Sequence, residues 1–208
     1  MRIALTRPEG QNEELGSRLR ALGHEIVVRP LIAIEPLGDE PIDLGAYDWL
    51  IVTSVNAARE LRRRGRGEPR RVAAIGRVTA DALGGADLLP EVSTQDGLLA
   101  ALPRPAGRVL FAGAEGARRL LIDELGADFV PLYRTRLLQP DVPPGVELTV
   151  LASPSAARSL AALGLGGPAV SLGPETTAAA RAGGIDVVEE ASPHDLDGLV
   201  AAVRRATS

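Results

Sequence analysis

The chain has 208 residues, a formal net charge of −4 and an aromatic content of 2%. It contains no cysteine, which excludes disulfides, thiolate zinc sites and thiol catalysis. All 23 basic residues are arginine, so Schiff-base chemistry and a phosphate-loop lysine are also excluded. The negative charge disfavours a general nucleic-acid surface, and the chain has neither a long apolar run nor a signal segment before its first predicted strand. We therefore expect a cytoplasmic protein without nucleic-acid or membrane partners.

Hydrophobic periodicity predicts strands that alternate with helices along the chain. The predicted strands are Ile3–Thr6, Glu25–Arg29, Trp49–Thr53, Val72–Ile75, Asp87–Leu89, Val109–Ala112, Phe129–Tyr133, Thr149–Ala152, Val170–Leu172 and Asp186–Glu189. The predicted helices lie near Gly10–Leu22, Val55–Arg64, Thr79–Leu83, Gly97–Ala101, Ala117–Leu125, Ser155–Ala162, Thr176–Ala182 and Asp195–Arg205. Such alternation predicts an α/β fold with parallel sheets. Five strands in each half favour two flavodoxin-like domains over a dinucleotide-binding fold.

The sequence repeats itself. Asp48–Leu61 matches Leu148–Leu160, and about 20 residues later Val72–Ala80 matches Ala169–Thr177. In each copy a buried apolar run is followed by a small hydroxyl residue and a helical stretch, which is the pattern of a strand that ends in an anion-binding turn. Two copies indicate two similar domains that face one shared ligand.

The domain boundary has two interpretations. A single linker at Leu102–Gly107 would separate the repeats, whereas two proline-bounded extended stretches, Pro30–Pro36 and Tyr133–Pro140, occupy equivalent repeat positions. The paired stretches favour two crossings between domains. The resulting prediction is a discontinuous domain of residues 1–35 plus 140–208, a second domain of residues 38–135, and linkers near residues 30–37 and 133–140.

Motifs for metals and nucleotides are missing from the sequence. There is no Gly-x-Gly-x-x-Gly after the first strand and no Walker loop, and the only histidines are His24 and His194. The acidic residues are scattered rather than clustered, which disfavours a hard-cation site. We therefore expect no metal and no cofactor, and a site built from hydroxyls and backbone donors.

Paired residues at strand ends are the candidate binding groups. They are Ser54 and Ser153 where a strand meets a helix, and Gly76 with Thr79 and Gly173 with Thr176 in the second phrase. A serine there can cap the helix, and the same turn offers backbone N–H groups to a carboxylate or phosphate. Simple capping explains any one of them. Their duplication at equivalent positions favours a ligand site.

Two further features carry opposed interpretations. Tyr133 begins the second predicted linker, and its phenol is either a proton donor in a site or a packing group with a local partner. The basic run Arg62–Arg71 lies at a helix C-terminus and lacks interleaved aromatic residues. We interpret this run as a solvated loop that complements the helix dipole, rather than as a nucleic-acid surface.

Six phrases in series resemble the uroporphyrinogen-III synthase family. They are Leu5–Pro8, Asp48–Ala57, Ala74–Ala80, Leu132–Thr135, Ala152–Ser155 and Leu172–Thr177, and they span nearly the whole chain in the right order. The resemblance implies two α/β domains joined by a two-stranded linker, with substrate in the cleft between them. One position departs from the family pattern, because Glu175 stands where a hydroxyl or small residue is common.

The resemblance also implies a reaction. A lyase of the hydro-lyase type would close linear hydroxymethylbilane to uroporphyrinogen III, with loss of water and inversion of the last pyrrole, in heme biosynthesis. Tyr133 corresponds to the family's cleft tyrosine and would assist departure of the hydroxyl. Substrate carboxylates would be held by Arg7, Ser54, Gly76, Thr79, Ser153, Gly173 and Thr176. A monomer is expected, with at most a transient contact with the preceding deaminase.

Two other functions remain open at this point. A non-catalytic sensor could keep the two-domain shell and bind a tetrapyrrole or another anion, although Tyr133 is retained. A nucleotide-sugar transferase would share the architecture, but the chain is short and lacks a phosphate-binding glycine loop. A net charge of −4 also requires that several donors act together on a substrate with eight carboxylates, and that the acidic residues lie away from it.

Overall fold

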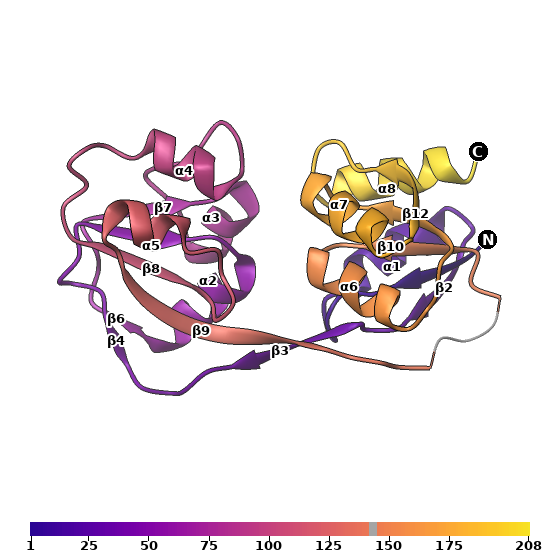
Figure 1. Cartoon of the computed structure of the whole chain (residues 1–208), viewed down its shortest axis with the longest axis horizontal. Helices are drawn as coiled ribbons and strands as arrows, with labels where there is room; N and C mark the ends of the chain where they lie inside the picture. Colours follow the sequence, from indigo (N-terminus) through magenta and orange to yellow (C-terminus); the bar gives the residue numbers. More distant parts are fainter. Residues whose placement is uncertain (142–144) are drawn as a thin grey trace. The chain divides into compact units, whose positions relative to one another are not determined.

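The computed structural model describes residues 1–141 and 145–208, and these residues form two compact units (Figure 1). Unit 1 comprises Met1–Ala33 and Arg136–Ser208, and unit 2 comprises Ile34–Thr135. The chain therefore passes from one unit to the other twice. Residues 142–144, which belong to the predicted segment 140–208, lie outside the described residues.

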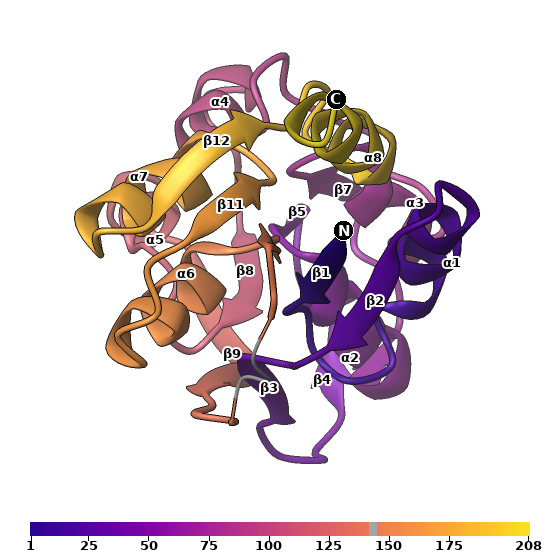
Figure 2. The ribbon, with the colours of Figure 1, turned by 90° about the vertical axis from the view of Figure 1, so that its right-hand side faces the viewer.

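Unit 1 is built on a five-stranded parallel sheet. Its strands, in spatial order, are β12 (Asp186–Glu190), β11 (Pro168–Ser171), β10 (Leu148–Leu151), β1 (Arg2–Leu5) and β2 (Glu25–Val28). Helices α1 (Glu13–Ala21) and α8 (Leu196–Ala206) cover one face, and α6 (Pro154–Ala162) and α7 (Pro174–Ala182) cover the other (Figure 2). Counted along the chain, the strand order across this sheet is 2-1-3-4-5.

The apolar strands of unit 1 are buried on both faces because helices lie on both sides. Val150 packs in the cluster that contains Leu15 and Leu19 of α1, whereas its neighbour Leu151 packs in the cluster that contains Leu160 of α6. Successive side chains of a strand point to opposite faces, so one short run feeds two cores.

Unit 2 contains a second five-stranded sheet. Its strands, in spatial order, are β3 (Ile32–Pro36), β9 (Asp128–Leu137), β8 (Val109–Ala114), β5 (Trp49–Val52) and β7 (Arg71–Ala74). The pairs β9–β8, β8–β5 and β5–β7 are parallel. Helices α2 (Val55–Arg64) and α3 (Arg77–Leu83) pack in one core cluster, and α4 (Gln95–Ala101) and α5 (Leu120–Leu125) pack in the other. A small parallel pair, β4 (Ile42–Asp43) with β6 (Gly65–Arg66), completes the unit.

Strand β3 pairs with β9 in the antiparallel sense. The N–H of Leu37 donates to the carbonyl of Leu132 at 2.9 Å, and the N–H of Leu138 donates to the carbonyl of Leu31 at 2.8 Å. These two segments are also the places where the chain passes between the units. Periodicity predicts both only as extended stretches, because nothing local indicates that two segments about 100 residues apart will pair. The family resemblance alone implies a two-stranded linker.

The two sheets share one strand order once the sequence repeat is applied. By the repeat, β10 and β11 of unit 1 correspond to β5 and β7 of unit 2, and β1 and β2 correspond to β8 and β9. The order β11-β10-β1-β2 therefore matches β7-β5-β8-β9. Each unit takes its strands from both repeats, so neither repeat forms a unit by itself.

The predicted strand Asp87–Leu89 is wrong in extent. Only an isolated bridge between Ala73 and Leu88 forms next to β7, at the position that β12 occupies in unit 1. Two glycines precede this segment and Pro90 follows it. Proline has no backbone N–H to donate to a neighbouring strand, so the pairing cannot continue.

The short strands β4 and β6 are absent from the prediction, since each has only two residues. No helix in the described ranges is long and apolar enough to cross a membrane.

Candidate functional site

Ser54 and Tyr133 meet at the carboxyl edge of the sheet in unit 2. Ser54 follows β5 and caps α2, and its Oγ accepts the N–H of Ala57 at 3.1 Å. The same Oγ lies 2.9 Å from the phenol oxygen of Tyr133, which comes from β9. Ligands of open α/β sheets bind at the carboxyl ends of the strands, so Ser54 and Tyr133 lie where a binding site is expected.

Strand β8 makes room for this contact, because it lies between β5 and β9 in the sheet. Its register with β9 shifts between Gly113 and Ala114, and Ala114 then stands opposite Tyr133. A methyl group added at Gly113 would lie 3.2 Å from the ring of Phe111 and 3.8 Å from Oγ1 of Thr53. Ala112 and Ala114 of β8 pack in the same core cluster as Tyr133, so the side chains of β8 on this face are small.

Tyr133 is 6% exposed. Burial raises the pKa of the Tyr133 phenol above its ordinary value, and hydrogen bonds with the side chains of Ser54 and Asn56 offset only part of that rise. A buried phenolate is disfavoured because it loses its hydration. The group is therefore neutral at physiological pH and carries a proton that it can donate.

The end of β7 carries the glycine–threonine pair of unit 2. Gly76 is the N-cap of α3 and provides no side-chain cap, and a methyl group added there would lie 3.2 Å from Oγ of Ser93. Thr79 lies in the first turn of α3 and is 5% exposed. Because β7 is the neighbour of β5, these residues lie on the same sheet edge as Ser54.

Unit 1 repeats the capping geometry. Ser153 follows β10 and caps α6, and its Oγ accepts the N–H of Ala156 at 3.2 Å. Its φ and ψ are −161° and 153°, against −160° and 152° for Ser54. The repeated phrase in the sequence thus produces the same local structure twice.

The remaining predicted residues of unit 1 lie around this edge. Gly173 is the N-cap of α7, and Thr176 in its first turn is 4% exposed. Arg7 lies in the loop after β1, and its carbonyl accepts the side-chain amide of Asn12 at 2.9 Å. Ser54 and Tyr133 are thus the predicted site residues that a hydrogen bond joins directly.

The sequence interpretation missed a polar cluster in unit 1. Ser171 Oγ lies 2.6 Å from Thr177 Oγ1, and Thr177 also contacts the carboxylate of Glu190. The other carboxylate oxygen of Glu190 lies 3.7 Å from Nε2 of His194. The sequence singles out Thr176, whereas its neighbour Thr177 makes these contacts. The available signal was the four-residue spacing of Glu190 and His194 directly after a predicted strand.

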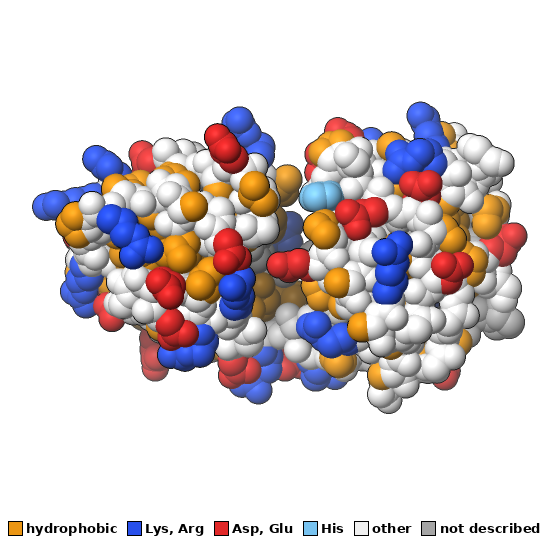
Figure 3. Space-filling model, turned by 45° about the horizontal axis from the view of Figure 1, so that its top comes forward, with side chains coloured by type: hydrophobic (Ala, Val, Ile, Leu, Met, Phe, Trp, Pro, Cys, Tyr) orange, Lys and Arg blue, Asp and Glu red, His pale blue; other side chains and the backbone are white. Residues whose placement is uncertain are grey.

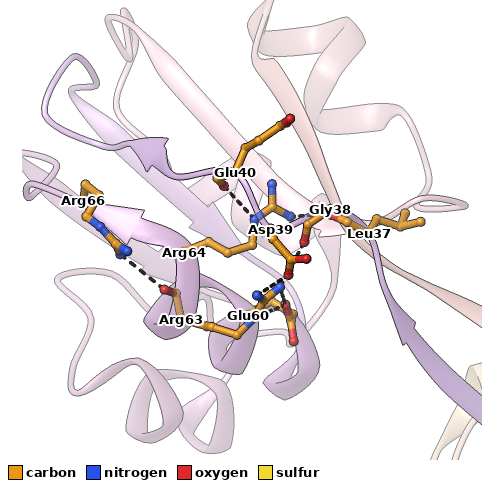
Figure 4. A network of polar contacts seen from close by, with 8 residues as sticks. All are labelled: Leu37, Gly38, Asp39, Glu40, Glu60, Arg63, Arg64 and Arg66. Atoms are coloured by element: carbon orange, nitrogen blue, oxygen red, sulfur yellow. Dashed lines mark hydrogen bonds and ion pairs between the residues drawn. The ribbon is translucent and has the colours of Figure 1, made fainter.

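The basic run after α2 is not a purely solvated loop. Arg64 is 7% exposed, and it donates to the carbonyls of Leu37 at 2.5 Å and Glu40 at 3.0 Å (Figure 4). Arg63 pairs with Glu60 and Asp39. The run therefore holds the segment between β3 and β4, and the interpretation of a solvated loop is wrong for Arg64.

Charge is mixed on the surface that Figure 3 shows. Acidic and basic side chains are interspersed over the visible faces of both units. No group of three or more histidine, cysteine, aspartate or glutamate residues that could hold a metal ion occurs among residues 1–141 and 145–208. The chemistry that the described residues support directly is proton transfer and anion binding by hydroxyls, amides and arginine.

Comparisons with known proteins agree on one family. The family model described as Uroporphyrinogen-III synthase HemD matches residues 13–201. The uroporphyrinogen-III synthase of Synechococcus elongatus is 30% identical over 159 residues, which are 64% of this chain and 60% of that relative. A crystal structure of a mutant uroporphyrinogen III synthase from Thermus thermophilus has a TM-score of 0.67 at 18% identity, and covers 100% of this chain and 98% of that one. This structural likeness establishes a shared fold.

Proposed function

We propose that this chain, which belongs to the uroporphyrinogen-III synthase family, closes hydroxymethylbilane to uroporphyrinogen III. The family match extends over residues 13–201. The aligned part of the cyanobacterial relative is 60% of its length, so the activity is inferred for this chain from its own residues as well. The hydrogen-bonded pair of Ser54 and Tyr133 is the observation that carries the proposal.

The proposed reaction balances without a cofactor. The C–O bond of the terminal hydroxymethyl group breaks and the oxygen leaves as water. The last pyrrole then attacks the resulting methylene carbon through its substituted α-carbon, which gives a spirocyclic intermediate. The older bond from that carbon to the bridge of the neighbouring pyrrole breaks, the bridge re-bonds to the unsubstituted α-carbon, and the hydrogen on that carbon is lost as a proton. The product is the substrate minus one water. Closure without enzyme would give the type I isomer, so the protein contributes orientation above all.

Tyr133 is the proposed proton donor to the leaving hydroxyl. The phenol is protonated at neutral pH and therefore carries the proton that this role requires, and its contact with Ser54 supports the assignment. Ser54 fixes the phenol oxygen, and the N–H of Ala57 fixes Ser54 in turn. The phenol of Tyr133 is thus held by a hydrogen bond to the residue that caps α2.

The carboxylates of the substrate are proposed to bind to residues at the carboxyl ends of the strands in the two sheets. Micromolar binding requires about 8 kcal/mol, whereas one exposed helix N-terminus contributes only about 0.3–1 kcal/mol. Several groups must therefore act together. They are the serines Ser54 and Ser153, the pairs Gly76 with Thr79 and Gly173 with Thr176, and Arg7.

Both units are proposed to be flavodoxin-like domains, with β3 and β9 as a two-stranded linker. The strand order 2-1-3-4-5 of unit 1 supports this assignment. The same proposal includes a discontinuous first domain, a monomeric state, a cytoplasmic location and no more than a transient contact with the preceding deaminase.

An isomer assay tests the proposed function. Purified protein is mixed with freshly generated hydroxymethylbilane, and the oxidised products are separated into uroporphyrin I and III. We expect type III to exceed the no-enzyme control. Type I alone, from protein shown to be folded, would reject catalysis and favour the alternative of a tetrapyrrole-binding sensor.

A further inference from the structure

We propose that His194 accepts the pyrrole proton in the ring closure, and that Thr177 and Glu190 position it. This inference rests on the proposed function and adds a second proton-transfer group to it. Tyr133 can supply a proton to the leaving hydroxyl, but the reaction also releases a proton from the α-carbon of the last pyrrole. The polar cluster of unit 1 contains the groups to receive that proton.

The hydrogen bonds in this cluster have one consistent direction. A threonine hydroxyl carries one hydrogen, and a carboxylate accepts a hydrogen bond more strongly than a neutral carbonyl does. Thr177 therefore donates to Glu190 rather than to the carbonyl of Gly173, which lies at 3.2 Å. Ser171, which is fully buried, then donates to Thr177. Both hydroxyls serve to fix one oxygen of Glu190.

Glu190 in turn faces the imidazole. Its second oxygen lies 3.7 Å from Nε2 of His194, which is slightly beyond hydrogen-bond distance. The His194 ring lies against the start of α7, because a methyl group added at Gly173 would be 3.2 Å from its Cγ. The side chain of His194 is 55% exposed, so a substrate can reach it. Catalytic hydrogen bonds are often longer than this limit before substrate binds, and an accessible imidazole beside a fixed carboxylate has the components of a general base.

Comparison of the two units shows that this cluster is specific to unit 1. In unit 1, His194 precedes the N-cap of α8 and lies against Gly173, the N-cap of α7. In unit 2, Ser93 holds the equivalent place: it precedes the N-cap of α4 and lies against Gly76, the N-cap of α3. By the sequence repeat, Ser171 and Thr177 correspond to Ala74 and Ala80, which have no hydroxyl. The fold therefore does not require the hydroxyls of the polar cluster, because unit 2 has the same local structure without them.

The charged surroundings of Glu190 and His194 are mixed. Arg205 of α8 donates to the carbonyl of Glu190 and pairs with Glu189. Asp195, next to His194, is engaged as the cap of α8. Glu175 lies in the first turn of α7.

The proposed proton transfer balances. The C–H bond at the α-carbon breaks, its electron pair returns to the pyrrole, and the proton passes to His194 and then to solvent.

The test replaces His194 with the residue that unit 2 uses, His194→Ser, with His24→Gln as the control for loss of the other histidine. We expect kcat for type III formation to fall about 10²-fold in His194→Ser, with KM within about twofold. Added imidazole should restore turnover in His194→Ala. His24→Gln should retain the wild-type kcat.

The positioning role is tested separately. Glu190→Gln and Thr177→Val should lower kcat and alter the pH profile, and Thr177→Ser, which keeps the hydroxyl, should recover both. An unchanged kcat in His194→Ser, or a change in KM alone, would overturn the inference while wild-type type III formation leaves the proposed function standing. Wild-type protein that yields only type I would instead reject the proposed function itself.

Discussion

Tyr133→Phe removes one atom from the centre of the proposed site. The aromatic ring packs with Leu132 and Val52 in a core cluster, and the substitution leaves that packing in place. The phenol oxygen loses its contact with Ser54, but Ser54 keeps the bond from the N–H of Ala57. The phenol also loses its hydrogen bond with Asn56, so the free energy of unfolding should fall by about 1–3 kcal/mol, the value of two hydrogen bonds.

Turnover should fall even where the variant remains folded. A positioned general acid accelerates a reaction by about 10²–10⁴-fold. Because Tyr133 is 6% exposed, water has little room to replace the lost hydroxyl. We expect kcat for type III formation to fall at least about 10²-fold, equivalent to about 2.7 kcal/mol of transition-state stabilisation, with KM nearly unchanged.

The chain provides a matched control in its only other tyrosine. Tyr47 donates to Asp128 at 3.0 Å and precedes β5, so it lies at the opposite edge of the sheet from Ser54. Initial rates and isomer ratios would be measured for both variants, with thermal unfolding followed by circular dichroism. Wild-type kcat in folded Tyr133→Phe, or an equal loss in Tyr47→Phe, would refute the reasoning.

Four further predictions concern binding and stability. Thr176→Ala should raise KM with little change in kcat, and an unchanged KM in steady-state kinetics would place this threonine outside the binding surface. Ser153→Ala should cost about 1 kcal/mol in urea unfolding through loss of the α6 cap, whereas Ser155→Ala, in the first turn of the same helix, should cost less. Arg64→Met should lower the unfolding free energy by about 1–3 kcal/mol, because the carbonyls of Leu37 and Glu40 lose their donor; a wild-type midpoint would contradict this. The raised pKa of Tyr133 means that the folded state holds this proton more tightly, so its stabilisation is complete below about pH 10 and is lost as pH rises through the folded pKa; Tyr133→Phe should show a weaker alkaline decline in unfolding titrations.

The parts of the site that depend on neighbouring residues were predictable. Ser54 and Ser153 bond to N–H groups three residues ahead, and a strand followed by a serine and a helical run is enough to indicate that geometry. The helices predicted to begin at Thr79 and Thr176 begin earlier, because Gly76 and Gly173 are their N-caps. Local hydrogen bonding leaves a local pattern in the sequence.

The parts that depend on distant residues were not predictable from periodicity. The contact between Ser54 and Tyr133 joins residues 79 apart. The place of Tyr133 in a predicted linker made it a candidate, and the family resemblance implied its catalytic role. The interaction of Thr177 with Glu190 depends on how β12 pairs with β11, including the register shift after Ala169. Burial of Arg64 likewise depends on a segment 24 residues earlier in the chain.

The differences between the two units bear on how the proton transfers are divided. Duplication explains the shared caps, yet position 133 on β9 corresponds through the repeat to Pro30, so unit 1 has no counterpart of the phenol. Unit 2 in turn has Ala80 and Ser93 where unit 1 has Thr177 and His194. A linear substrate with a hydroxymethyl group at one end and a free pyrrole α-carbon at the other requires a proton donor and a proton acceptor, which are different groups. If His194→Ser and Tyr133→Phe each lower kcat with KM nearly unchanged, both groups take part in turnover; wild-type kcat in folded His194→Ser would instead mean that the pyrrole proton leaves without this imidazole.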